Sequence, residues 1–429
     1  MSIILENPHG SCALGGANAT LSAIRRAVPI LHSGPGCGMQ TTAGEASQGS
    51  LRLPYFVAYT ALPSTNMLEQ EVIFGGEKKL EEHIAGALEL FDADAFFVLS
   101  GCTAGIIGDD IQSVVRKYRE RGAPVYAVNS AGFLGESYRG YEIAVNALLD
   151  NIVDPTPEKV REEDMVNVLG IMPYHDPYWE GNFEEIVRLL HKLGLRANTF
   201  FSHNQGIADI RRSSCSSLNI ILHPWLLKEA AKEYESRFGI PAFRWPGAPL
   251  GASDTNAFLR AVGEATGRSA LAEALIEEEE RYFYRYLETG LGLQSWRRFA
   301  VVGESTNVIP ITRFLANDYS FTPEVAVITD MVFRPEDKKR IEDQLLHLET
   351  SRPPEVAYTG DQWEINQTLE RFPETSLIIG STNEGEFAMK RGIQHFIACY
   401  PNTERLIYNR SCAGYRGALT FMEDIYSNL

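Results

Sequence analysis

The sequence contains few cysteines, and their arrangement excludes several common architectures. Only six occur among 429 residues, which is too few for a disulfide-stabilised scaffold. No two of them form a C-x-x-C pair, so the sequence predicts neither a zinc ribbon nor a thioredoxin-type redox motif. In a reducing compartment such cysteines are expected as buried thiols or, where they cluster in space, as metal ligands.

Basic residues and long apolar runs are also scarce. The chain has 39 Lys and Arg against 56 Asp and Glu, a formal net charge of −17, and such a surface repels phosphate backbones. No run approaches the roughly 20 consecutive apolar residues that cross a bilayer. The N-terminus has neither the basic start nor the long apolar stretch of a secretory signal. We therefore expect a cytoplasmic protein that binds neither nucleic acid nor membranes.

Several motifs of nucleotide-binding proteins and hydrolases are missing. The sequence has no GxxxxGK(S/T) loop, and residues 74–80 (FGGEKKL) are too short and too acidic to replace one. It has no GxSxG elbow and no HExxH pair. Among the scattered histidines, His223 is the one best placed to face a cavity, although a structural role at a strand end is the simpler interpretation. We do not expect this chain to bind ATP.

What the sequence does contain is a recurring pattern of short apolar runs, each followed by a turn and, in several cases, an amphipathic helix. The runs are residues 95–100, 124–128, 165–171, 196–201, 217–222, 298–303, 324–329 and 376–380, and helical patterns cover 106–120, 182–193 and 224–238. Short continuous apolar strands that alternate with helices indicate buried parallel sheets and βαβ units.

Three groups of these runs predict an α/β protein with three doubly wound, Rossmann-like domains. We place a cluster-binding domain at residues 1–160 and two further domains at 161–295 and 296–429. A long helical stretch at 269–289 separates the second and third groups, and its acidic run 277–280 is expected on a solvated face. Ligands of open parallel sheets lie at the carboxyl ends of the strands.

Three cysteines lie in glycine-rich turns. Cys12 is in GSCALGGA (10–17), Cys37 in HSGPGCG (32–38), and Cys102 in SGCTAG directly after the run 95–100. Glycines let the backbone approach a bulky inorganic group and free N–H donors for its sulfides. Each cysteine alone is a weak signal, because free cysteines are often buried. Together they favour iron–sulfur ligation, with a partner chain or a non-cysteine ligand completing the site.

The other three cysteines have different neighbours. Cys215 precedes a predicted strand, Cys399 lies in the apolar run 396–400 and is expected in the core, and Cys412 is ambiguous.

These motifs resemble the nitrogenase component 1 superfamily over essentially the whole chain. Cys12 and Cys37 are 25 residues apart, which is the spacing of the first two cluster cysteines in the nitrogenase β subunit. The segments that match further family landmarks are 32–38, 74–80 and 102–111. Those that resemble a β-type chain are 132–135, 218–222, 238–241 and 414–420.

The resemblance implies a shared cofactor and a multi-subunit complex. Cys12, Cys37 and Cys102 would bind an iron–sulfur cluster, P-type 8Fe-7S or alternatively 4Fe-4S, at an interface with an α-type subunit in an α2β2 heterotetramer. A separate ATP-hydrolysing iron protein would supply electrons. His223 takes the position of the α-type cofactor cysteine, so we do not expect this chain to bind the active-site cofactor. Gly132 replaces a serine that can bind the oxidised cluster.

Within the superfamily, the complete cysteine triplet and the short segment before Cys12 resemble nitrogenase-like reductases. Methylthio-alkane reductase, which reduces a C–S bond, fits best. Nitrogenase proper, a cofactor-assembly scaffold and a (bacterio)chlorophyll-type tetrapyrrole reductase subunit are the alternatives.

Overall fold

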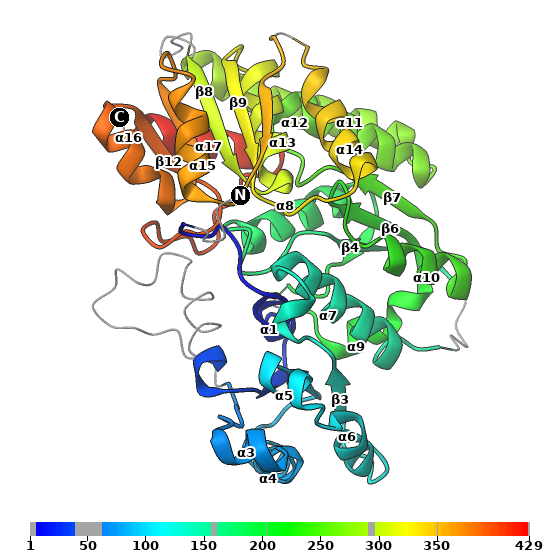
Figure 1. Cartoon of the computed structure of the whole chain (residues 1–429). Coiled ribbons are helices and arrows are strands. Elements are labelled where there is room, and N and C mark those ends of the chain that lie inside the picture. Colours follow the sequence, from blue (N-terminus) through cyan, green and yellow to red (C-terminus); the bar gives the residue numbers. More distant parts are fainter. Residues whose placement is uncertain are drawn as a thin grey trace.

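The protein, seen here as a computed structural model, is built on three separate parallel sheets. The structure describes residues 6–38, 62–155, 161–202, 204–290, 297–349 and 351–427. In Figure 1 the first sheet lies at the bottom, the third at the top, and the second between them on the right. The α/β class with parallel sheets, predicted from the alternating runs, is confirmed.

The first sheet carries the cysteine turns. Its strands β1 (Ala27–His32), β2 (Ala95–Ser100) and β3 (Val125–Val128) run parallel in the order β1-β2-β3. Alternate side chains of these strands enter two separate cores. Helices α4 (Glu77–Leu90) and α6 (Ile111–Arg119) pack on one face, and α1 (Ala13–Ser22) and α7 (Ser137–Asn151) pack on the other. Helix α3 (Glu69–Phe74) and the 3₁₀ turn η2 (Gly132–Leu134) lie in the connections.

The second sheet has the order β5-β4-β6-β7. Its strands are β4 (Glu162–Leu169), β5 (Arg196–Asn198), β6 (Ser216–Leu222) and β7 (Ala242–Trp245), and its helices are α8 (Trp179–Lys192), α9 (Ile207–Arg211), α10 (Lys228–Phe238), α11 (Gly251–Ala265) and α12 (Ser269–Gly290), with the 3₁₀ turn η3 (Arg212–Cys215). None of the helices in the described residues is long and apolar enough to cross a bilayer.

The third sheet has the order β10-β9-β8-β11-β12, so the chain winds outward from β8 in both directions. Its strands are β8 (Arg298–Gly303), β9 (Thr322–Ile328), β10 (Glu355–Tyr358), β11 (Leu377–Gly380) and β12 (Gln394–Ile397), and its helices are α13 (Ser305–Asn317), α14 (Pro335–Leu346), α15 (Gln362–Glu370), α16 (Gly385–Arg391) and the final α17 (Gly414–Ser427), with the 3₁₀ turn η5 (Thr382–Glu384).

The predicted runs do not include β1, β7 or β10, and two further local predictions differ from the structure. The helix predicted over 106–120 is divided into α5 (Cys102–Ile107) and α6. Gly108 adopts a left-handed conformation with φ of 80° and ends α5, and the Asp110 side chain accepts from the Ser113 N–H to begin α6. In the acidic run 277–280, Glu279 is not solvated: it is 1% exposed and binds Arg188 and Lys192 of α8.

Each end of the chain packs against a domain other than its own. The Gln362 N–H donates to the Glu6 carbonyl at 2.9 Å, and His9 Nε2 bonds Gln362 Oε1 at 2.7 Å, so residues 6–9 rest on the third domain. Helix α17 packs against α8, α11 and α12 of the second domain. Each range assigned from the sequence contains one sheet, but the division at 160 and 295 stays a prediction.

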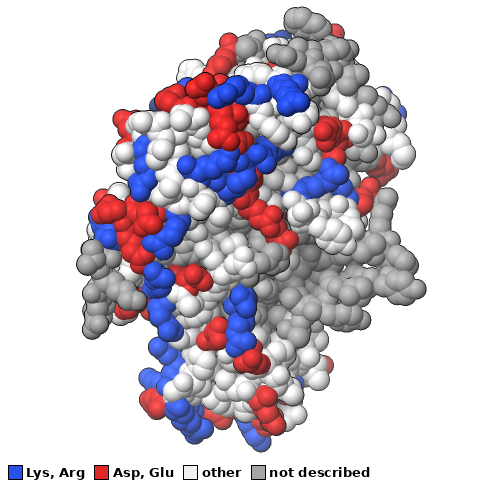
Figure 2. All heavy atoms as spheres, turned by 180° about the vertical axis from the view of Figure 1, so that it is seen from behind, with Lys and Arg blue, Asp and Glu red and all other residues white. Residues whose placement is uncertain are grey.

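Acidic and basic side chains are interspersed on the described part of the face shown in Figure 2. The net charge of −17 is therefore not gathered into one acidic patch on this face.

Candidate functional site

Two of the three candidate cysteines converge on one point of the first domain. Cys102 begins α5 directly after β2, and Cys12 is the residue before α1. A Cβ atom built on Gly132 would lie 3.0 Å from Cys102 Sγ and 3.1 Å from Cys12 Sγ. Both sulfur atoms therefore face η2, and both cysteines are partly exposed.

The Cys12 turn is fixed by backbone contacts with the segment after η2. Cys12 forms an isolated antiparallel bridge with Glu136, and the Ala13 N–H donates to the Gly135 carbonyl at 2.8 Å. Helices α1 and α7 then pack backbone against backbone. A Cβ on Gly16 would overlap the backbone of Ser137, which explains why a glycine is required one helical turn after this cysteine.

Cys37 lies in the neighbouring turn after β1. The Gly101 N–H donates to the His32 carbonyl at 2.9 Å, and a Cβ on Gly34 would come within 3.9 Å of Thr103 Oγ1, so the Cys37 and Cys102 turns lie side by side. Within the described residues, however, no three His, Cys, Asp or Glu side chains are placed to hold one metal ion. The Cys37 turn is therefore adjacent to the Cys102 turn, but the three cysteines do not form a single-ion site among the described residues.

A buried histidine–aspartate pair connects the segments that carry Cys37 and Cys102. His32 Nε2 lies 2.8 Å from Asp109 Oδ2, and its Nδ1 lies 3.2 Å from Thr65 Oγ1. Asp109 also accepts from the Gly76 N–H at 3.0 Å. Burial lowers the pKa of His32 despite the opposing effect of Asp109, so the ring is neutral at pH 7. This pair joins the 32–38 turn, the 74–80 motif and the loop after Cys102. The sequence suggested these motifs separately but not their contact.

Exposed apolar side chains surround the cysteine turns. Phe74 of α3 is 82% exposed, Ile106 of α5 75%, and Phe133 of η2 60%. The Phe133 ring packs over α5, because a Cβ on Gly105 would lie 3.3 Å from its tip. Exposed large apolar side chains that lie close together are typical of binding surfaces.

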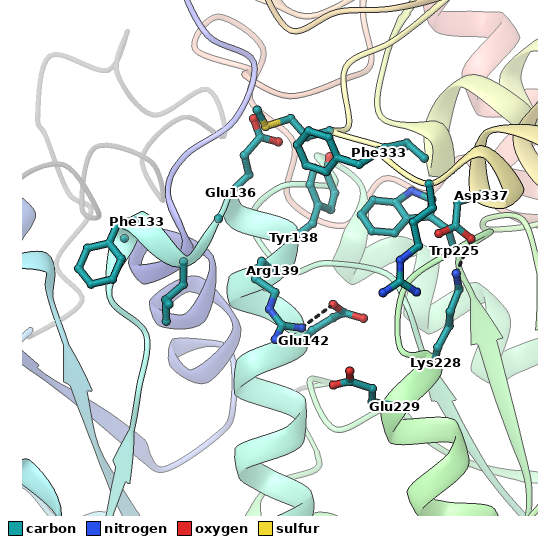
Figure 3. A pocket seen from close by; sticks show the side chains of 16 residues that line it. Phe133, Glu136, Tyr138, Arg139, Glu142, Trp225, Lys228, Glu229, Phe333 and Asp337 are labelled. Atoms are coloured by element: carbon teal, nitrogen blue, oxygen red, sulfur yellow. Dashed lines mark hydrogen bonds and ion pairs between the residues drawn. The ribbon is translucent and has the colours of Figure 1, made fainter. Parts of the chain in front are cut away.

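A pocket of about 600 Å³ opens beside the same turn, between the three domains. Its walls are η2 and the start of α7, residues 225–229 before and within α10, and residues 331–337 before and within α14 (Figure 3). Gly132 belongs to both the pocket and the cysteine site. Burial raises the pKa of Glu136 in its wall to about 7. Sequence reasoning missed this pocket, because its three segments are far apart in the chain.

His223 does not line this pocket. It is 1% exposed, and its Nδ1 accepts from the N–H groups of Trp225 at 3.3 Å and Leu226 at 3.2 Å. Burial lowers the pKa of His223 well below its usual value, so the ring is neutral. These contacts give His223 a structural role in the turn that follows β6.

The remaining cysteines are buried. Cys399 is fully buried, which confirms its predicted place in the core. Cys412 Sγ lies 3.4 Å from Asn182 Oδ1, and Cys215 precedes β6. Burial raises the pKa of the Cys399 and Cys412 thiols, which keeps them protonated and makes them poor metal ligands.

Comparison with known proteins places the whole architecture in one family. Residues 12–429 match the family described as Nitrogenase component 1 type Oxidoreductase. The chain is 27% identical to the nitrogenase iron-molybdenum cofactor biosynthesis protein NifE of Methanococcus maripaludis, over 97% of this chain and 82% of that protein. It is 23% identical to the nitrogenase molybdenum-iron protein beta chain of Methanococcus maripaludis, over 99% and 94%.

The solved structure of nitrogenase Cp1 at pH 6.5 superimposes with a TM-score of 0.81 at 20% identity, covering 100% of this chain and 94% of that one. This likeness extends the match from sequence to fold. The chain belongs to the nitrogenase component 1 family of oxidoreductases.

Proposed function

We propose that this chain is the β-type subunit of an ATP-dependent nitrogenase-like reductase, and that Cys12, Cys37 and Cys102 hold an iron–sulfur cluster shared with an α-type subunit. The observation that carries the proposal is the convergence of Cys12 Sγ and Cys102 Sγ on Gly132. Both cysteines are partly exposed, and Cys102 and Gly132 follow the carboxyl ends of β2 and β3, where ligands of parallel sheets bind.

The residues present fit an iron–sulfur cluster better than a single ion. Thiolates are the usual ligands of such clusters, and a glycine at 132 lets this turn approach both sulfur atoms, which any side chain would crowd. A cluster of several irons spans more space than one ion, which suits three cysteines that do not form a single-ion site. When bound, the cluster supplies one-electron transfer. The chain's own role is to bind and orient it and to exclude water.

The surroundings of the cysteines support a shared site. A cluster normally takes about four or more protein thiolates, and these neighbouring turns offer three. The exposed Phe74, Ile106 and Phe133 beside it suit burial by an α-type partner, which would bring the missing ligands. Two such pairs would form the α2β2 heterotetramer. Because the sequence has no phosphate-binding loop, ATP hydrolysis belongs to a separate iron protein.

For the reaction, we propose reduction of a C–S bond, as in methylthio-alkane reductase, at a cofactor held by the α-type subunit. The retained cysteine triplet favours an electron-relaying subunit of this kind over the β-like chain of a cofactor-assembly scaffold or of a tetrapyrrole reductase. The role of this chain in that reaction is to relay electrons from the iron protein to the partner's cofactor.

A second candidate function is a scaffold on which a metal cofactor is assembled. The observation that favours it is the likeness to NifE proteins, 27% identical over 97% of this chain in Methanococcus maripaludis and 26% over 97% in Clostridium pasteurianum. A scaffold would release its cofactor to another protein, whereas a reductase would keep it through turnover.

Anaerobic co-purification with the partner chain tests both functions. We expect a stable complex whose iron and sulfide content matches a multi-iron cluster at each pair of chains, and reduction of methylthio-alkanes that requires ATP and the iron protein. Transfer of cofactor to an acceptor protein without turnover would favour the scaffold. A cluster-loaded monomer of this chain alone would contradict the shared site.

A further inference from the structure

The pocket between the three domains has two aromatic rings fixed in its wall. Trp225 Nε1 donates to Asp330 Oδ2 at 2.9 Å, and the Tyr138 hydroxyl is hydrogen-bonded to the Glu304 side chain. The two ring centroids are 6.2 Å apart, with 53° between the ring planes. Since a buried carboxyl group holds each ring, this part of the pocket is formed before any ligand arrives.

A third ring, Phe333, completes this end of the pocket from the third domain. It is 79% exposed, although its backbone segment is held against the first domain by the hydrogen bond between Glu136 and the Met331 backbone. Figure 3 shows Phe333, Tyr138 and Trp225 grouped at one end of the pocket with Glu136 beside them, and most of the charged side chains at the other end.

The lining of the pocket has one more acidic than basic side chain, but burial raises the pKa of Glu136 to about 7, so Glu136 is only partly ionised at neutral pH. The four acidic residues of the lining are Glu136, Glu142, Glu229 and Asp337, and its three basic residues are Arg139, Lys228 and Arg334. Arg139 is paired with Glu142 and Lys228 with Asp337. Among the described residues, neither Glu136 nor Glu229 has an ion-pair partner. An incoming anion would find only Arg334 uncommitted.

We propose that this pocket binds an organic cation, such as a quaternary ammonium or sulfonium group with apolar substituents. Aromatic faces attract such cations through the ring quadrupole, and a nearby carboxylate adds charge attraction. The volume of about 600 Å³ accommodates a methylated cationic head together with an apolar chain. This inference goes beyond the proposed electron relay and does not depend on the cluster.

Isothermal titration of the full chain, co-purified with its partner, tests the proposal with choline and its neutral carbon isostere, in which a quaternary carbon replaces the nitrogen. We expect choline to bind about tenfold more tightly, as a desolvated cation–π site implies. Equal affinity for the two probes, or binding of neither, would overturn the proposal.

Exposed positions allow variants that leave the fold intact. Phe333→Leu should weaken choline binding about fivefold without changing the affinity for the neutral isostere, and Tyr408→Leu, at a ring that is 72% exposed elsewhere, should change neither. Glu229→Gln should also weaken choline binding, by about two- to fivefold, while Glu120→Gln on the exposed end of α6 should not. If Phe333→Leu weakens both probes equally, the pocket recognises apolar surface rather than charge.

The same titration on a Cys12→Ala, Cys102→Ala double variant separates this inference from the electron relay. Choline binding should persist when the cluster is lost. Binding that disappears with the iron would overturn the claim that the pocket is an independent site.

Discussion

The partly exposed Cys12 and Cys102 can be compared with the buried Cys399. The sulfur atoms of all three lie close to a glycine, but their surroundings differ. A Cβ on Gly132 would lie about 3 Å from the first two sulfur atoms, and a Cβ on Gly303 would lie 2.5 Å from Cys399 Sγ. Cys12 and Cys102 are partly exposed in two neighbouring turns, whereas Cys399 is fully buried against the end of β8. Contact with a glycine alone therefore does not distinguish the proposed cluster ligands from a core thiol, whereas access from outside the chain does.

The largest expected effect comes from exchanging the two kinds of cysteine for alanine. Cys102→Ala should abolish cluster binding by the co-purified complex, because a thiolate that faces the shared site is lost. Cys399→Ala should retain all the iron and lower only the free energy of unfolding, by about 1 kcal/mol for a small buried atom. Iron counting and chemical denaturation measure the two outcomes. Equal iron content in both variants would remove the distinction between them.

An intermediate effect is expected from filling the space beside each set of sulfur atoms. Gly132→Val would place methyl groups where the cluster is proposed to lie, so we expect loss of most of the bound iron with a folded chain. Gly303→Ala would overlap Cys399 Sγ and should destabilise the fold by about 1–3 kcal/mol with its iron content unchanged. Iron content and thermal unfolding should be measured on both variants. Full iron in Gly132→Val would place the cluster elsewhere.

Local sequence patterns predicted most of the strands but missed β1, β7 and β10. The runs at 95–100 and 298–303 are β2 and β8 with identical bounds, because a buried parallel strand needs only a short apolar run between turn residues. Cys102 could be placed at a strand end for the same reason. The pattern over 106–120 failed because Gly108 in a left-handed conformation interrupts the helix, and helical periodicity alone does not register such a break.

Contacts between distant segments could not be predicted from those patterns. The convergence of Cys12 on Gly132 depends on backbone packing of α1 against α7. The pocket depends on Tyr138, Trp225 and Phe333, which come from three domains. Glu279 looked solvated within an acidic run, but α8 presents Arg188 to it. Each of these features is set by tertiary packing, which overrides the local signal.

The smallest expected effect is a dependence of stability on pH. It arises in residues 6–9, which precede Cys12 and contact the third domain. His9 Nε2 lies 3.3 Å from Glu384 Oε1, and both side chains are buried. Burial alone would lower the pKa of His9, but Glu384 and Gln362 more than offset this and raise it. Burial would likewise raise the pKa of Glu384, but His9 lowers it. Both pKa shifts therefore favour the charged forms, protonated His9 and ionised Glu384.

Because the pKa of His9 is raised in the folded chain, its contribution to stability is fully present below the unfolded value of about 6.5 and is lost as the pH rises through the folded value. His9→Gln should remove that dependence and keep a hydrogen bond to Gln362 possible, while His83→Gln on the partly exposed α4 should leave it unchanged. Chemical denaturation between about pH 6 and 9 measures this, and a stability curve of the same shape in His9→Gln would show that the pair does not act as proposed. Iron release should be followed over the same pH range, because the segment that His9 anchors leads directly to Cys12, one of the proposed cluster ligands.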